Sequence, residues 1–300
     1  MSVKSKIFYW YAAFVIAFTL VLLLPAPDSA TLVRYHISAL GLRLLDATFI
    51  IPEALIWFAA FYGYAKLHSY SQLIQTGKDG KQIARLATGL LLLAVGLPVG
   101  AILGGILSII AAHEPSFKNP SVIISNYLGV LFPLLAFLWI GRGARGLSNL
   151  IKGRPQFWKT NVTTVAVITL GVIFCCLIVL DHAELRKAYH MSPELVMLTL
   201  GIPYMYTWFL GFFASVELQT YSQRVTGVVY RRGWNTLILG FVSIILLSIL
   251  IQYLSTLTTW LTSLSLGWAL LLLYALLFLL AGAYIVVALG ATRLTKIEEA

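Results

Sequence analysis

Charged residues are scarce in this chain of 300 residues. They make up 11% of it, while hydrophobic residues make up 60%. A soluble domain carries about 25% charged residues. The excess lies in long uncharged runs, and the loops between these runs are short. The sequence therefore leaves no room for a soluble domain, a glycine-rich nucleotide loop or an extended nucleic-acid surface.

Cysteine is also rare. Cys175 and Cys176 are the two that occur, and they are adjacent inside one apolar run. Neighbouring residues on a helix point to different faces, so we expect no bridge between them. We interpret both as small apolar side chains, and no disulfide framework is present to indicate a compartment.

Motifs for catalysis and metal binding are missing. The chain has no HExxH, GxSxG or phosphate-loop motif. Its five histidines show no metal-ligand spacing, and a metal site needs three or four converging ligands. We therefore predict no metal and no haem or other cofactor, and these absences favour a protein that is not an enzyme without deciding it. Since four of the histidines fall on one predicted side, a pH-sensitive surface is the alternative to ordinary loop residues.

Eight apolar runs divide the chain. Each has roughly the 20 residues needed to cross the hydrocarbon of a bilayer, and helices are expected because an isolated strand would leave backbone groups unpaired in lipid. The first run could also begin a signal peptide, but its counterpart at 162–180 lies mid-chain, so we interpret it as a helix. The predicted spans are 9–24, 42–66, 86–112, 121–141, 162–180, 194–216, 235–254 and 264–290.

The basic residues predict an orientation. The formal net charge is +10, and 16 of the 21 Lys and Arg residues fall on one predicted side of the spans, including both chain ends. Short loops rich in Lys and Arg face the cytoplasm. We interpret the charge in this way rather than as nucleic-acid binding, and predict a multi-pass cell-membrane protein with cytoplasmic N- and C-termini.

One segment occurs twice. Residues 51–72 return at 202–223 with a constant spacing of 151 and no gap, and a Trp-Phe pair and a Tyr-Ser-Gln run recur in register. Four spans per copy give both copies the same orientation. We therefore predict an all-α membrane protein of eight helices, built as two parallel four-helix repeats. The repeats are residues 1–150 and 151–300, joined through a basic loop at 141–160.

A polar stripe follows one face of the second predicted span. It consists of Arg43, Asp46, Glu53, Trp57 and Tyr64, whose spacing places them on one side of a helix. An acid costs about 2.5–3.5 kcal/mol at the centre of a membrane helix. Asp46 can pair with Arg43, whereas Glu53 has no basic residue within one turn. Glu53 is either protonated and hydrogen-bonded or part of a functional site.

The duplication suggests contacts for this stripe. Equivalent positions can meet near a two-fold axis, so we expect the second and sixth spans to face each other. The expected contacts are Arg43 with Glu194, Lys66 with Glu217, and Glu53 with Tyr204. At the cytoplasmic ends of these spans, Tyr70, Gln72, Tyr221 and Gln223 form either a paired polar gate or an interfacial anchor inherited by duplication.

These patterns favour a small-solute or ion transporter or channel. Its path would follow the second and sixth spans, and prolines 52 and 203 would let the halves move. The residues predicted to line the path are Glu53, Asp46, Tyr204, Trp57, Trp208, Arg43 and Glu194. A non-catalytic scaffold, sensor or complex subunit is the alternative, and a membrane-embedded enzyme is a third. The predicted partners are the lipid bilayer, a small solute or cation, and a protein partner or second copy, but not nucleic acid.

Overall fold

The described part of the chain is helical throughout. The computed structural model describes residues 39–74, 78–113, 118–150, 202–225, 227–260 and 266–299, and these contain six helices and no strand. The helices are α3 (Ala39–Leu73), α4 (Lys78–His113), α5 (Lys118–Leu150), α9 (Ile202–Arg224), α10 (Val228–Trp260) and α11 (Leu266–Glu299).

These helices coincide with six of the eight predicted spans. The predicted spans 9–24 and 162–180 lie outside the described residues. Each observed helix extends beyond its span toward the Lys- and Arg-rich end: α3 continues to Leu73, and α4 begins at Lys78 rather than at Leu86. Lys, Arg and Gln are good helix formers, so a helix need not stop where its apolar run stops.

Four of the described helices are long and apolar enough to cross a membrane. The qualifying stretches are Lys78–Gly100, Leu128–Leu150, Val228–Ile251 and Leu271–Lys296, in α4, α5, α10 and α11. The described parts of α3 and α9 are not in this set; α3 carries two carboxylates, α9 carries one, and both helices carry several tyrosines. The apolar helices are consistent with a membrane-embedded protein.

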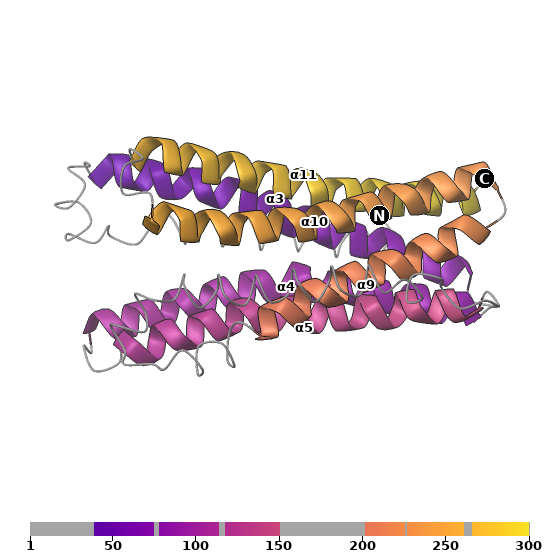
Figure 1. The fold of residues 1–300 in the computed structure, drawn as a ribbon, viewed down its shortest axis with the longest axis horizontal. Helices are drawn as coiled ribbons and strands as arrows, with labels where there is room; N and C mark the ends of the chain where they lie inside the picture. Colours follow the sequence, from indigo (N-terminus) through magenta and orange to yellow (C-terminus); the bar gives the residue numbers. More distant parts are fainter. Residues whose placement is uncertain are drawn as a thin grey trace, which may run out of the picture.

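The six helices form a closed ring. Each one packs against two others, in the order α3, α4, α5, α9, α10, α11 and back to α3. The helices run along the long axis of the molecule (Figure 1). Helices that follow each other across a short loop run in opposite directions, whereas α3 and α11 run in parallel: Gly63 lies beside Ala288, and the Thr295 hydroxyl donates a hydrogen bond to the Lys66 carbonyl oxygen at 3.1 Å.

Glycines allow two of the helix pairs to approach closely. A Cβ atom on Gly89 of α4 would lie 2.8 Å from the Ala136 carbonyl oxygen of α5. A Cβ atom on Gly240 of α10 would lie 2.7 Å from the Val287 nitrogen and 3.0 Å from the Ala283 oxygen of α11. Such backbone contact is how small residues stabilise helix pairs in membranes.

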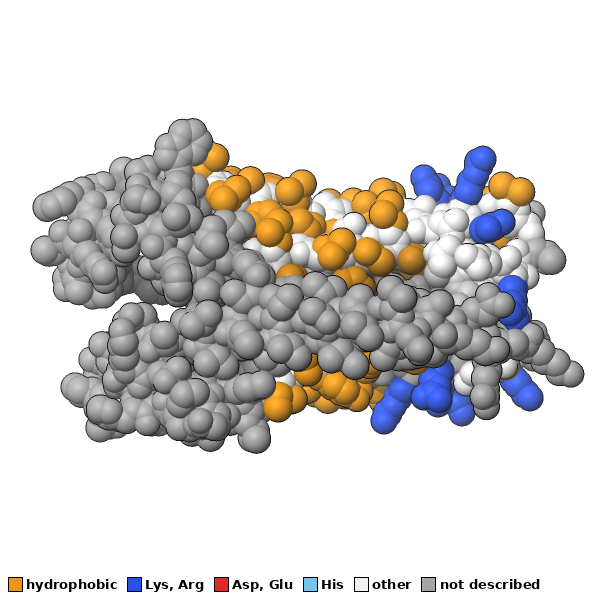
Figure 2. Space-filling view, in the orientation of Figure 1, with side chains coloured by type: hydrophobic (Ala, Val, Ile, Leu, Met, Phe, Trp, Pro, Cys, Tyr) orange, Lys and Arg blue, Asp and Glu red, His pale blue; other side chains and the backbone are white. Residues whose placement is uncertain are grey.

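One end of the ring is basic and tightly packed. Every described Lys and Arg side chain lies there, and Figure 2 shows several of them in blue at the right-hand end. Leu67, Leu86, Leu147 and Leu218 are fully buried toward this end. Exposed apolar side chains such as Leu239 and Leu279 cover the middle of the helices, where a bilayer would contact them.

Candidate functional site

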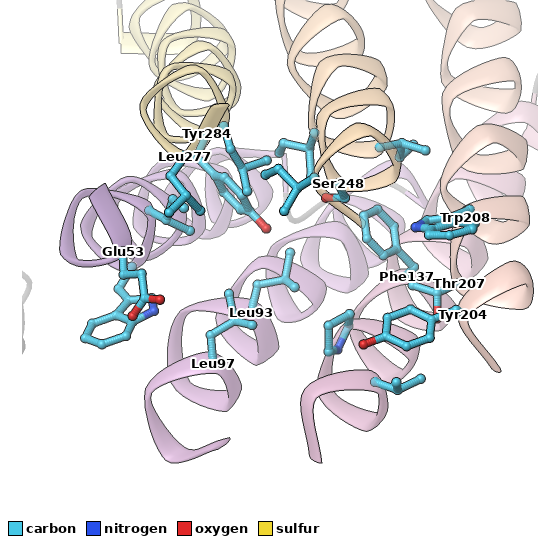
Figure 3. Close-up of a pocket in the computed structure, with 18 residues that line it drawn as sticks. Glu53, Leu93, Leu97, Phe137, Tyr204, Thr207, Trp208, Ser248, Leu277 and Tyr284 are labelled. Carbon is cyan, nitrogen blue, oxygen red and sulfur yellow. The ribbon is translucent and has the colours of Figure 1, made fainter. Parts of the chain in front are cut away.

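A cavity lies inside the helix ring. Its volume is about 340 Å³, and all six described helices contribute to its wall (Figure 3). This size falls within the range of about 300–1,000 Å³ that is typical of small-molecule sites. Most of the wall is aliphatic or aromatic, with a few polar groups.

Glu53 is the carboxylate of this wall. It lies on α3 directly after Pro52, which is inside the helix as predicted. Among the described residues that line the cavity there is no second acid and no Lys, Arg or His. Pro203 is the second residue of α9 in the described part of the chain, so the bend expected there stays a prediction.

Aromatic rings make up much of the remaining wall. Trp57 lies one helical turn after Glu53, and the rings of Tyr204 and Trp208 lie 6.0 Å apart on α9. Tyr284 enters from α11. In Figure 3 the hydroxyls of Tyr204 and Tyr284 point toward the space between the helices.

Two more hydroxyl side chains reach the wall. Ser248 lies on α10, and Thr207 on α9 donates its hydrogen bond to the Pro203 carbonyl oxygen at 2.8 Å. The cavity therefore combines one carboxylate, a few hydroxyls and several ring faces.

Of the 18 described lining residues, 16 fall into pairs of constant spacing, and Ile245 and Ile251 do not. Along α3, α4, α9 and α10 the spacing is 151, as in the duplicated segment. Along α5 and α11 it is 147, as between Gly143-Ala144 and Gly290-Ala291. The pairs are Glu53 and Tyr204, Ile56 and Thr207, Trp57 and Trp208, Leu93 and Ile244, Leu97 and Ser248, Val130 and Leu277, Pro133 and Leu280, and Phe137 and Tyr284.

The expected direct contact between the second and sixth spans is wrong. The helices α3 and α9 occupy opposite positions in the ring and are not neighbours among the described helices. Figure 3 places Glu53 and Tyr204 on opposite walls. The cavity separates the two side chains, and the hydrogen bond expected between them is not formed.

The expected pair of Lys66 and Glu217 is also not formed. The Lys66 Nζ atom lies 5.6 Å from the centre of the Tyr62 ring. Glu217 is 5% exposed, and its Oε2 atom has no hydrogen-bond partner in the described structure. The side chains of Arg43 and Asp46, and the whole of Glu194, lie outside the described residues, so their predicted roles stay predictions.

Buried aromatic side chains pack together inside the ring of helices, toward its basic end. The Trp234 ring of α10 lies 5.1 Å from the Tyr221 ring of α9 and 6.4 Å from the Tyr70 ring of α3. The second contact crosses the ring, since α3 and α10 are not neighbours in it. The Tyr221 hydroxyl also donates a hydrogen bond across the ring, to Asp79 Oδ2 of α4 at 3.4 Å. We call Tyr70, Tyr221 and Trp234 the basal plug.

Only part of the predicted gate contributes to this plug. Tyr70 and Tyr221 are in it, but Gln72 and Gln223 are exposed, and Gln72 Nε2 lies 3.1 Å from His68 Nε2. Trp234 and Asp79 were not predicted. Both lie in basic segments next to a loop. A Trp or an Asp is common at such a position, so the sequence offers no reason to single them out.

The described residues contain no group of three or more His, Cys, Asp or Glu side chains that could hold a metal ion. Comparison of the chain with protein-family models, curated proteins and solved structures finds no match.

Proposed function

We propose that this protein is a small-solute or ion transporter or channel of the cell membrane. The observation that carries the proposal is the cavity itself, which is lined by all six described helices and has a carboxylate on its wall. An acid placed within a membrane helix bundle is costly and is usually found where a substrate or ion passes.

The basic end would face the cytoplasm, with both termini there, because Lys and Arg collect on that side. The basal plug would then close the path from the cytoplasm in the state described. Two parallel repeats, residues 1–150 and 151–300, would move against each other to open it. The paired lining positions, and the similar close contacts of Gly89 and Gly240, support this arrangement.

Water access to the cavity from both sides tests the proposal. Ser248 is changed to Cys in a background where Cys175 and Cys176 are Ala, and a charged, membrane-impermeant thiol reagent is applied to right-side-out and to inverted vesicles. A transport path requires that Ser248→Cys be labelled from each side in at least one condition. Leu279→Cys is the control. This position is 58% exposed on the outer surface of α11, where lipid should keep the reagent away.

Labelling from neither side would contradict the proposal. A sealed cavity would favour the alternative of a scaffold, sensor or complex subunit, which a partner copurifying in constant ratio would then identify. Labelling from the same side in every condition would contradict transport and would indicate a protein that binds a ligand from that side only.

A further inference from the structure

We propose that the ligand of the central cavity is a monovalent organic cation with an aromatic or bulky apolar group. This inference rests on the proposed function, because it names the substrate class of the same cavity. The alternatives are an anion, a bare metal ion and a neutral solute.

The charge on the cavity wall argues against an anion. Among the described lining residues, Glu53 is the single carboxylate, and none of them is a Lys, Arg or His that could balance an anionic ligand. A charge taken out of water needs a partner of opposite sign. A cation placed beside Glu53 would satisfy both charges.

The rings next to this carboxylate suit an organic cation. Trp57 follows Glu53 by four residues, so the indole and the carboxylate share one face of α3. Trp208 and Tyr204 stand on α9 across the cavity, and Tyr284 on α11. The faces of aromatic rings attract cations, Trp most strongly, and such rings recognise quaternary ammonium groups.

The size and the oxygen atoms of the cavity argue against a bare metal ion. Calcium takes about six to eight oxygen ligands at 2.3–2.6 Å. Here Glu53 and Tyr204 stand on opposite walls, and the hydroxyl of Thr207 donates to the backbone. A volume of about 340 Å³ lined mainly by apolar groups fits an organic body instead.

Calorimetric titration of the full chain in nanodiscs tests the inference. The probes are tetramethylammonium, benzyltrimethylammonium and tetraphenylphosphonium, with phenylmethanesulfonate as the anion and benzyl alcohol as the neutral compound. We expect at least one cation to bind and the anion not to bind. Glu53→Gln should weaken cation binding by about 10- to 100-fold, which is the usual effect of losing a charged partner. Trp57→Leu should weaken it by a smaller factor.

Two variants serve as controls. Glu217→Gln removes a buried carboxylate that does not line the cavity and should leave the affinity within about twofold of the wild type. Glu53→Asp keeps the charge and should retain most of the affinity, which separates loss of charge from misfolding.

Three results would overturn the inference: no binding of any cation, binding of the anion or of benzyl alcohol as tight as that of benzyltrimethylammonium, or cation affinity that Glu53→Gln leaves unchanged. These results are distinct from failure of the proposed function. A cation that binds but is not taken up by proteoliposomes would contradict transport alone. A cavity labelled from both sides that binds no cation would contradict the ligand class alone.

Discussion

A methyl group added at Gly89 or Gly240 should separate two packed helices. The new Cβ would lie 2.8 Å from the Ala136 oxygen in the first case and 2.7 Å from the Val287 nitrogen in the second, while ordinary contact begins at 3.4 Å. Since both opposing atoms belong to the backbone, they cannot turn aside as a side chain would. Each helix pair would have to open by about 0.6–0.7 Å to restore ordinary contact at these atoms.

The expected cost follows from two opposing effects. Forcing an extra methyl group into a packed interface costs about 1–3 kcal/mol. Replacing Gly by Ala inside a helix recovers up to about 0.5–1 kcal/mol. A glycine with free space around it serves as the control. Its change to Ala gains helix stability without crowding, so the difference between the two variants measures the cost of crowding alone.

The chain offers such a control in each half. A Cβ atom on Gly129 of α5 or Gly282 of α11 would have nothing within 4 Å. We expect Gly89→Ala and Gly240→Ala to unfold about 2–10 °C below Gly129→Ala and Gly282→Ala. The assay is loss of the monodisperse gel-filtration peak after heating in detergent.

The result that would refute this reasoning is a Gly89→Ala or Gly240→Ala protein as heat-resistant as the controls. In that case the close helix contacts are not as described. A large effect at one glycine and none at the other would mean that the two halves pack differently, which would weaken the proposed duplication.

The other predictions concern the basic end of the ring. Glu217→Met should raise the free energy of unfolding by about 1–3 kcal/mol, because it removes a buried oxygen without a partner; a lower heat resistance would contradict this. Trp234→Ala should cost about 3–5 kcal/mol and should make Ser248→Cys reactive from the basic side; unchanged labelling would show that the basal plug is not the barrier. Burial, and then the nearby Asp79 carboxylate, raise the pKa of the Tyr221 hydroxyl. An unfolded tyrosine ionises near pH 10, so above that pH the wild type should lose stability relative to Tyr221→Phe, and parallel denaturation curves at pH 8 and pH 11 would contradict this.

The helices could be predicted from the sequence because each requires only an apolar run of sufficient length. The sequence also singled out Glu53, Trp57, Tyr204 and Trp208, which lie on equivalent faces of two matching segments and line the cavity. Their role in a substrate or ion path stays a prediction. Ser248 and Tyr284 were not predicted. A single Ser or Tyr within an apolar run is common, and only the fold shows that these two line the cavity.

The distance between the two matching helices could not be predicted. A repeat indicates that equivalent positions surround an axis, but not how far from it they lie. Here the interposed pairs of α4 with α5 and α10 with α11 hold α3 and α9 apart. Lys66 and Glu217 lie on these two helices and do not pair in the described structure, although their opposite charges suggested it.

The contact between α3 and α11 joins the first described helix to the last. During synthesis on the ribosome, α3 cannot make this contact until α11 has been made. Until then the flank of α3 that carries Gly63, and later meets Ala288, lacks this neighbour. Closure of the ring is thus a late event in synthesis, and a transcript cut short before α11 would encode a set of helices with an open seam.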